Sequence, residues 1–150
     1  MNTIIDFSML LPAPCNNYAG PTLAVWFLVI INTIGTIRSL IHMFFHDGGA
    51  QSIATMNLNV SGSQNIVAIF GQWGGMQLIM AFFIWIILWR YREFVPLMIG
   101  EVLIEQLVRI SIGHLKPTIT TGTPPGRTGS MILLPVSIIM LIISLMRNTA

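Results

Sequence analysis

Four long apolar stretches, separated by short polar segments, dominate the pattern of hydrophobic and polar positions along the chain. The second and fourth stretches contain no charged residue, and the first contains one, Arg38, close to its end. About 20 helical residues, at roughly 1.5 Å each, cross the hydrocarbon core of a bilayer. The pattern therefore predicts four transmembrane helices, at residues 21–41, 65–89, 94–115 and 130–146.

The composition supports a lipid environment. Hydrophobic residues make up 54% of the 150-residue chain and charged residues 8%, and the mean hydropathy is +0.79. A soluble domain carries about 25% charged residues, so this chain cannot cover a water-exposed surface. Its high apolar content also excludes intrinsic disorder. We expect an all-α integral membrane protein, a single four-helix bundle covering residues 1–150.

The segments between the stretches, residues 42–63, 90–93 and 116–129, are predicted to be loops. The sequence Asp47-Gly48-Gly49 predicts a turn, and residues 51–58 are a candidate for a short interfacial helix. Residues 116–129 are rich in Thr, Gly and Pro and are predicted to be non-helical. Four spans place both termini on the same side of the membrane. The distribution of Lys and Arg favours the cytoplasmic side by a small margin.

Charge and cysteine content exclude several functions. The net charge is +2, and the seven basic residues are scattered without a run or a stripe, so nucleic acid is not an expected partner. The single cysteine, Cys15, excludes an internal disulfide and a Cys-x-x-Cys redox motif. Residues 1–15 contain no Lys or Arg, so we interpret them as a retained lead-in to the first helix rather than a cleaved signal.

Glu101, Glu105 and Arg109 lie inside the third stretch at spacing i, i+4, i+8, which places them on one helix face. A charge at the bilayer centre costs about 3 kcal/mol, so this face must look into the bundle. Glu105 and Arg109 are in the favourable order for an ion pair. Glu101 then needs a proton or a second cation. The group is either an internal ion pair that locks the bundle or a functional track with Glu101 and Glu105 as candidate catalytic carboxyls.

A second group, Arg38, His42 and His46, has the same spacing at the end of the first stretch. Antiparallel packing of four spans brings Arg109 and His114 to the same end of the bundle. We therefore expect Arg38, His42, Arg109 and His114 to form a site for an anion, such as a lipid head group. Histidines at i and i+4 also make His42 and His46 candidate metal ligands, although no metal motif is present, and no cofactor can be named.

The end of the third stretch carries the pattern R-x-S-x-G-x-x-x-P, at Arg109, Ser111, Gly113 and Pro117. With the glycine-rich start of the second stretch, residues 70–75, this pattern resembles DoxX-like four-helix membrane proteins, especially a bacterial group without an assigned function. The resemblance covers about residues 33–143 and implies a four-helix bundle in the bacterial inner membrane. Gly71 and Gly75 also form a small-xxx-small pair, which permits close approach of helices.

Three classes of function remain open. The chain is small and has few chemically active groups, which favours a non-catalytic subunit or accessory protein of a membrane complex, or a homo-oligomer. The second class is a binder or carrier of an apolar ligand, such as a quinone or a lipid, that uses the Glu/Arg track. The third is a membrane enzyme with Glu101 and Glu105 as an acid–base pair, which the lack of any recognisable catalytic motif makes less favoured.

Overall fold

The computed structural model describes residues 13–147, and this part of the chain contains four long helices and no strand. The predicted all-helical class is confirmed, while the outer ends of the predicted 1–150 domain lie outside the described residues. The helices are α1 (Thr22–Phe44), α2 (Ser63–Arg90), α3 (Val95–Leu115) and α4 (Pro125–Ser144), with the short 3₁₀ helix η2 (Arg92–Phe94) between α2 and α3.

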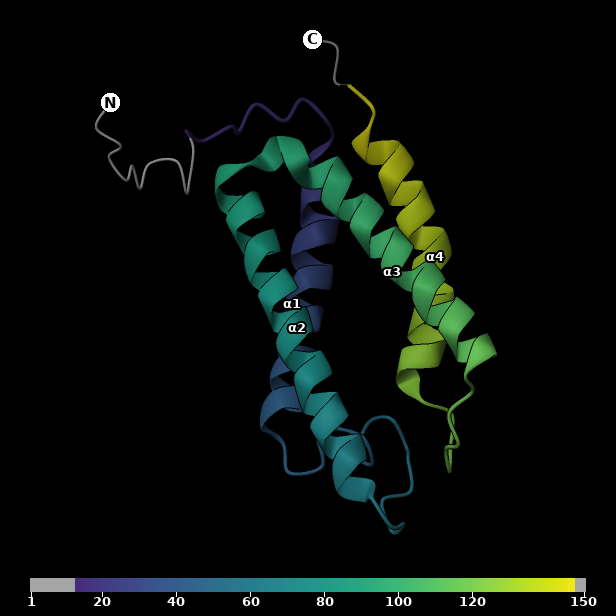
Figure 1. The fold of residues 1–150 in the computed structure, drawn as a ribbon. Coiled ribbons are helices and arrows are strands. Elements are labelled where there is room, and N and C mark those ends of the chain that lie inside the picture. Colours follow the sequence, from purple (N-terminus) through teal and green to yellow (C-terminus); the bar gives the residue numbers. More distant parts are fainter. Residues whose placement is uncertain (1–12, 148–150) are drawn as a thin grey trace, which may run out of the picture.

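The helices form two antiparallel hairpins (Figure 1). In the first hairpin α1 packs along α2, and in the second α3 packs along α4. The two hairpins meet at the end where α2 turns into α3, and they diverge toward the end that holds residues 45–62 and 116–124 (Figure 1). The shape is therefore a V rather than a uniformly packed bundle.

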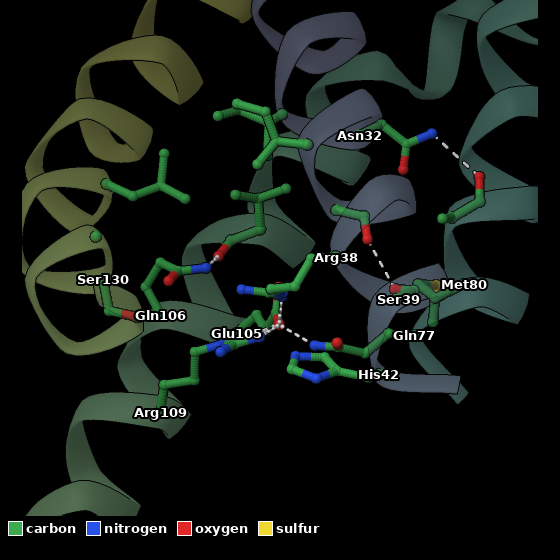
Figure 2. A pocket seen from close by; sticks show the side chains of 18 of the residues that line it. Asn32, Arg38, Ser39, His42, Gln77, Met80, Glu105, Gln106, Arg109 and Ser130 are labelled. Atoms are coloured by element: carbon green, nitrogen blue, oxygen red, sulfur yellow. Dashed lines mark hydrogen bonds and ion pairs between the residues drawn. The ribbon is translucent and has the colours of Figure 1, made fainter. Parts of the chain in front are cut away.

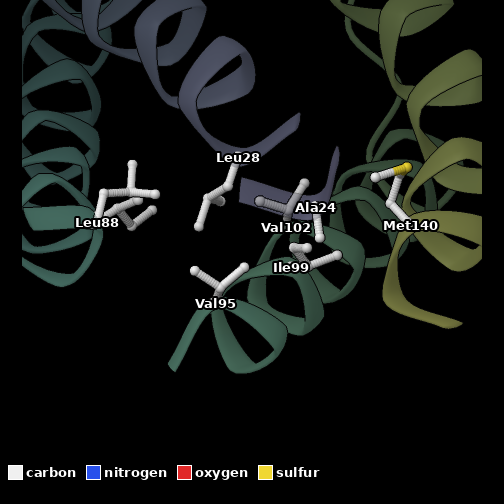
Figure 3. Close-up of a cluster of buried hydrophobic side chains, with 8 residues drawn as sticks. Ala24, Leu28, Leu88, Val95, Ile99, Val102 and Met140 are labelled. Atoms are coloured by element: carbon white, nitrogen blue, oxygen red, sulfur yellow. The ribbon is translucent and has the colours of Figure 1, made fainter. Parts of the chain in front are cut away.

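A cluster of buried apolar side chains joins the hairpins at their narrow end (Figure 3). Val95, Ile99 and Val102 recur at helical spacing along α3 and form one buried stripe. They pack with Ala24 and Leu28, from the start of α1, and with residues near the ends of α2 and α4. Close packing of this kind, rather than water exclusion, holds helices together in lipid.

Among the glycines of α2, Gly74 lies nearest to α1. A Cβ added there would lie 2.6 Å from His42 Cβ and 3.0 Å from the carbonyl oxygen of Ser39. At Gly71 the nearest atom is 3.7 Å away, and at Gly75 it is the flexible Met43 side chain at 3.9 Å. The predicted role of Gly75 is therefore wrong. Close packing selects Gly74 because that position, and not Gly75, faces the α1 backbone.

The segment after α1 is a compact series of turns, and the candidate helix at residues 51–58 does not form. The Asp47 carboxylate accepts hydrogen bonds from the backbone amides of Gly49 (2.9 Å) and Ser52 (2.7 Å). Burial opposes its ionisation, but these donors outweigh burial and lower the pKa of Asp47 to about 2. The bonded carboxylate, with Gly48 and Gly49 at positive φ, favours turns over a helix here.

The prediction that residues 116–129 are non-helical is wrong for residues 125–129, because α4 begins at Pro125. Proline is well placed in a first helical turn, where its missing N–H group leaves no hydrogen bond unmade. The two prolines thus start the helix where composition indicated a loop. Helix α4 also continues through Pro135.

Helices α1, α2 and α4 are long and apolar enough to cross a membrane. Helix α3 has 21 residues but carries Glu101, Glu105 and Arg109. Residues 13–21, the described segment before α1, lie at the same end of the molecule as the end of α4 (Figure 1). There the Tyr18 hydroxyl donates to the carbonyl oxygen of Ser144 at 2.8 Å. The rest of the predicted lead-in, residues 1–12, lies outside the described part.

Candidate functional site

The diverging hairpins enclose a cleft of about 1080 Å³, lined by residues from all four helices and from both loops at the wide end. Apolar side chains such as Leu28, Ile84 and Leu133 line the part nearest the buried core. Polar side chains gather farther toward the wide end, near the ends of α1 and α3, and Figure 2 shows several of them from close by. We call this group the polar cluster; it consists of Arg38, His42, Trp73, Gln77, Glu105 and Arg109.

The Glu105 carboxylate is the centre of the polar cluster (Figure 2). Its Oε1 atom accepts hydrogen bonds from Arg109 Nη2 (2.6 Å) and Nε (3.0 Å), and from Gln77 Nε2 at 3.3 Å. Arg38 Nη2 lies 3.9 Å from the same oxygen. The predicted ion pair of Glu105 and Arg109 is confirmed. One carboxylate therefore links side chains from α1, α2 and α3.

Trp73 is the platform on which the cationic side chains lie. The guanidinium carbon of Arg109 is 5.0 Å from the indole ring centroid, and that of Arg38 is 5.8 Å away. The His42 ring stacks on the same indole, with 5.1 Å between ring centroids and an interplanar angle of 28°. Arginine favours aromatic faces because its planar, weakly hydrated cation stacks on the π system. The cluster thus concentrates positive charge around one ring.

Sequence reasoning did not single out Trp73 or Gln77. The signal that could have found them is their spacing i, i+4 in an otherwise uncharged stretch, which places both on one face of α2. Gln77 is a strongly polar side chain in the middle of that stretch. Only the packing of α2 against α1 and near α3 brings this face to the arginines.

Two atoms of the cluster have no hydrogen-bond partner among the described residues although they are buried. They are Arg38 Nε, a donor, and Gln77 Oε1, an acceptor. Two other buried polar side chains in the cleft wall bond to nearby carbonyl groups: Asn32 donates to the carbonyl oxygen of Ala81 at 3.1 Å, and Gln106 to that of Val102 at 3.2 Å. Among the side chains that line the cleft, the unmet hydrogen-bonding capacity is therefore in the polar cluster.

Of the other predicted site residues, Glu101 lies in the cleft wall and His114 lies outside the cleft. Glu101 lines the cleft one helical turn from Glu105 and makes no hydrogen bond or ion pair with any described residue. His114 is exposed at the end of α3, where its Nδ1 lies 2.7 Å from the carbonyl oxygen of Ile110, and it does not line the cleft. The predicted anion site thus gathers Arg38, His42 and Arg109 without His114.

The i, i+4 pair of His42 and His46 does not form on a helix, because α1 ends at Phe44. His46 is exposed in the turns that follow, whereas His42 is buried and its Nδ1 lies 2.7 Å from the carbonyl oxygen of Gly48. Within residues 13–147 no group of three or more His, Cys, Asp or Glu side chains is placed to hold a metal ion.

Family models, curated proteins and solved structures were compared with the chain, and none matches.

The loops join across the wide end of the cleft. The backbone amide and hydroxyl of Thr121 donate to the carbonyl oxygen of Thr55 at 2.8 and 2.9 Å, and the Thr55 hydroxyl donates to the carbonyl oxygen of Gly122 at 3.1 Å. Thr55 has a φ of 55°, which is rare for a β-branched residue. The cleft thus lies between the buried core at one end and this contact between loops at the other.

Proposed function

We propose that this protein binds or carries an amphiphilic ligand, with the apolar part in the cleft and the polar end at the polar cluster. The observation that carries the proposal is the cleft itself, which combines a volume of about 1080 Å³, an apolar part and one localised group of charged side chains. Sites for small molecules are mostly apolar cavities of about 300–1,000 Å³ with a few placed polar groups. The cleft fits this description, with a volume just above the usual range.

The enzyme alternative would use Glu101 and Glu105 as an acid–base pair. Glu105 Oε1 accepts three hydrogen bonds, two of them from Arg109, which favours a structural ion pair over a free catalytic carboxyl. Glu101 lines the cleft without such contacts, so the enzyme alternative rests on that one carboxyl. The accessory-subunit alternative has no comparable support from a particular contact, and it becomes an outcome of the test below.

The four-span arrangement belongs to the same proposal. Helix α3 would cross the membrane beside α4, with its three charged side chains on the cleft side rather than toward lipid. The resemblance to DoxX-like proteins supports a bacterial inner membrane, and the charge distribution supports cytoplasmic termini.

Single cysteines test the four spans in a Cys15→Ala background. We expect Ser61→Cys and Thr121→Cys to be labelled by a membrane-impermeant maleimide from one side of the membrane, and Glu93→Cys from the other. The reason is that Ser61 and Thr121 belong to the loops at the wide end, whereas Glu93 lies in η2 at the narrow end (Figure 1). Labelling of Glu93→Cys from the same side as Ser61→Cys would exclude this topology.

A cleft-filling substitution tests ligand binding. A Cβ at Gly35 would meet nothing within 4 Å, and this glycine lines the cleft. Gly35→Phe should therefore place a ring in the cleft without distorting the helices. We expect native mass spectrometry of the protein in mild detergent to show bound lipid or quinone in the wild type and at least a fivefold lower occupancy in Gly35→Phe.

The matched control is Gly100→Phe, since a Cβ there also meets nothing within 4 Å but Gly100 does not line the cleft. Its ligand occupancy should equal that of the wild type. Equal occupancy in all three proteins would disprove binding in the cleft. A stoichiometric protein partner, with no small molecule bound, would instead support the accessory-subunit function.

A further inference from the structure

The polar cluster holds more positive than negative charge. Arg38 and Arg109 cannot lose their charge, and among the described residues Glu105 is the one acidic side chain in ion-pair contact with either of them. Both short bonds from arginine to Glu105 come from Arg109, and 3.9 Å is too long for a hydrogen bond from Arg38. Arg38 is therefore within ion-pair distance of Glu105 but has no hydrogen-bonded anionic acceptor among the described residues.

The two unpartnered atoms define what the cluster lacks. Arg38 Nε needs an acceptor, and Gln77 Oε1 needs a donor. The orientation of the Gln77 amide follows from its other contact, because Nε2 faces the Glu105 carboxylate, which can only accept. Arg38 Nη2 and Gln77 Nε2 lie 3.9 and 3.3 Å from the same oxygen of Glu105. The two side chains therefore end at one place in the cleft, where one small group could serve both.

Few single functional groups offer an anion and a donor at once. An ionised carboxylate, a phosphodiester group and a quinone each supply acceptors alone, and an alcohol supplies a donor without charge. A phosphate monoester with one proton supplies a single negative charge, acceptor oxygens and a P–O–H donor. Arginine forks also match phosphate geometry, particularly where the guanidinium is stacked on an aromatic ring, as on Trp73.

We propose that the ligand is a lipid-like phosphate monoester, bound as its monoanion. Its phosphate oxygens accept from Arg38, its P–O–H group donates to Gln77 Oε1, and Glu105 remains the partner of Arg109. The apolar chain extends into the part of the cleft near Leu28 and Ile84. This inference rests on the proposed cleft-binding function and specifies the class of its ligand.

Four single-chain amphiphiles separate the contributions of charge and donor. Oleoyl lysophosphatidic acid has both, oleoyl cyclic phosphatidic acid and oleyl sulfate have charge without a donor, and monooleoylglycerol has hydroxyl donors without charge. They are titrated onto the full-length protein by native mass spectrometry at about pH 5.5, where a phosphate monoester is mostly the monoanion because its second pKa is about 6. We expect lysophosphatidic acid to bind about tenfold more tightly than each of the others.

Variants then locate the head group. Arg38→Gln should lower the affinity for lysophosphatidic acid about tenfold and the affinity for monooleoylglycerol less than twofold. Arg38→Lys keeps the charge but loses the Nε donor, and it should give an intermediate loss. In Gln77→Leu, the affinity for lysophosphatidic acid should fall to the affinity for oleoyl cyclic phosphatidic acid. The matched control is Arg147→Gln, an exposed arginine beyond α4, which should leave all four affinities unchanged. Unchanged thermal melting shows that a variant is folded.

The outcomes separate the two proposals. If all four amphiphiles bind with equal affinity and Gly35→Phe weakens them all, the cleft binds apolar chains and the monoester inference is wrong. The inference is also wrong if lysophosphatidic acid is preferred but Arg38→Gln and Gln77→Leu leave the preference intact. If none of the four binds the wild type and no co-purified amphiphile responds to Gly35→Phe, the proposed function itself fails.

Discussion

Gly74→Ala is expected to lower the free energy of unfolding by about 3 kcal/mol, in the upper part of the range for overpacking. The added Cβ would lie 2.6 Å from His42 Cβ, 3.0 Å from the Ser39 carbonyl oxygen and 3.1 Å from the Met43 amide nitrogen. Two of these atoms belong to the α1 backbone, so a side-chain rotation cannot relieve the overlap. The α1–α2 pair must separate. Reversible unfolding in mixed detergent micelles measures the change.

Gly75→Ala is the control for Gly74→Ala, because it has the same chemistry one residue along the same helix. The nearest atom to its added Cβ is Met43 Sδ at 3.9 Å, an ordinary contact with a flexible side chain. We expect its stability to lie within about 0.5 kcal/mol of the wild type, as for substitutions that disturb no packing. Equal losses for the two variants would mean that α1 and α2 do not approach at Gly74.

Glu105→Ala should destabilise the protein by about 2–3 kcal/mol, and Glu105→Gln by clearly less. Alanine removes the acceptor of Arg109 Nη2, Arg109 Nε and Gln77 Nε2 together, whereas glutamine keeps a carbonyl oxygen in their place. A fully buried pair loses about 3–5 kcal/mol when one partner is removed. The smaller figure applies here because 36% of the Glu105 side chain is exposed.

Glu101→Ala provides the comparison for Glu105→Ala, one turn earlier on the same helix. Glu101 makes no hydrogen bond or ion pair with the described residues, so its loss should change the melting temperature little. Identical melting temperatures for Glu105→Ala and Glu105→Gln in detergent would argue against a structural role for the ion pair. A larger loss in Glu101→Ala than in Glu105→Ala would place the important carboxyl at Glu101.

Local patterns in the sequence predicted the helices well where the pattern was long and apolar. The predicted starts or ends of α1, α2 and α3 differ from the structure by up to three residues. The errors occur where side chains override composition. Pro125 starts a helix that its Pro-Gly neighbourhood argued against, and the Asp47 carboxylate holds the following residues in turns.

The sequence by itself determined the helical, lipid-compatible character of the chain and the pair of Glu105 with Arg109. Both follow from local physics, since apolar length selects a helix in lipid and spacing i, i+4 brings two side chains together within one helix. Tertiary structure alone decided that Gly74 contacts α1, that Trp73 and Gln77 join Arg38 and Arg109, and that His114 stays outside. These contacts depend on the rotation and separation of helices that are distant in sequence. Packing across the helix interface sets that rotation, and no single stretch of sequence encodes this packing.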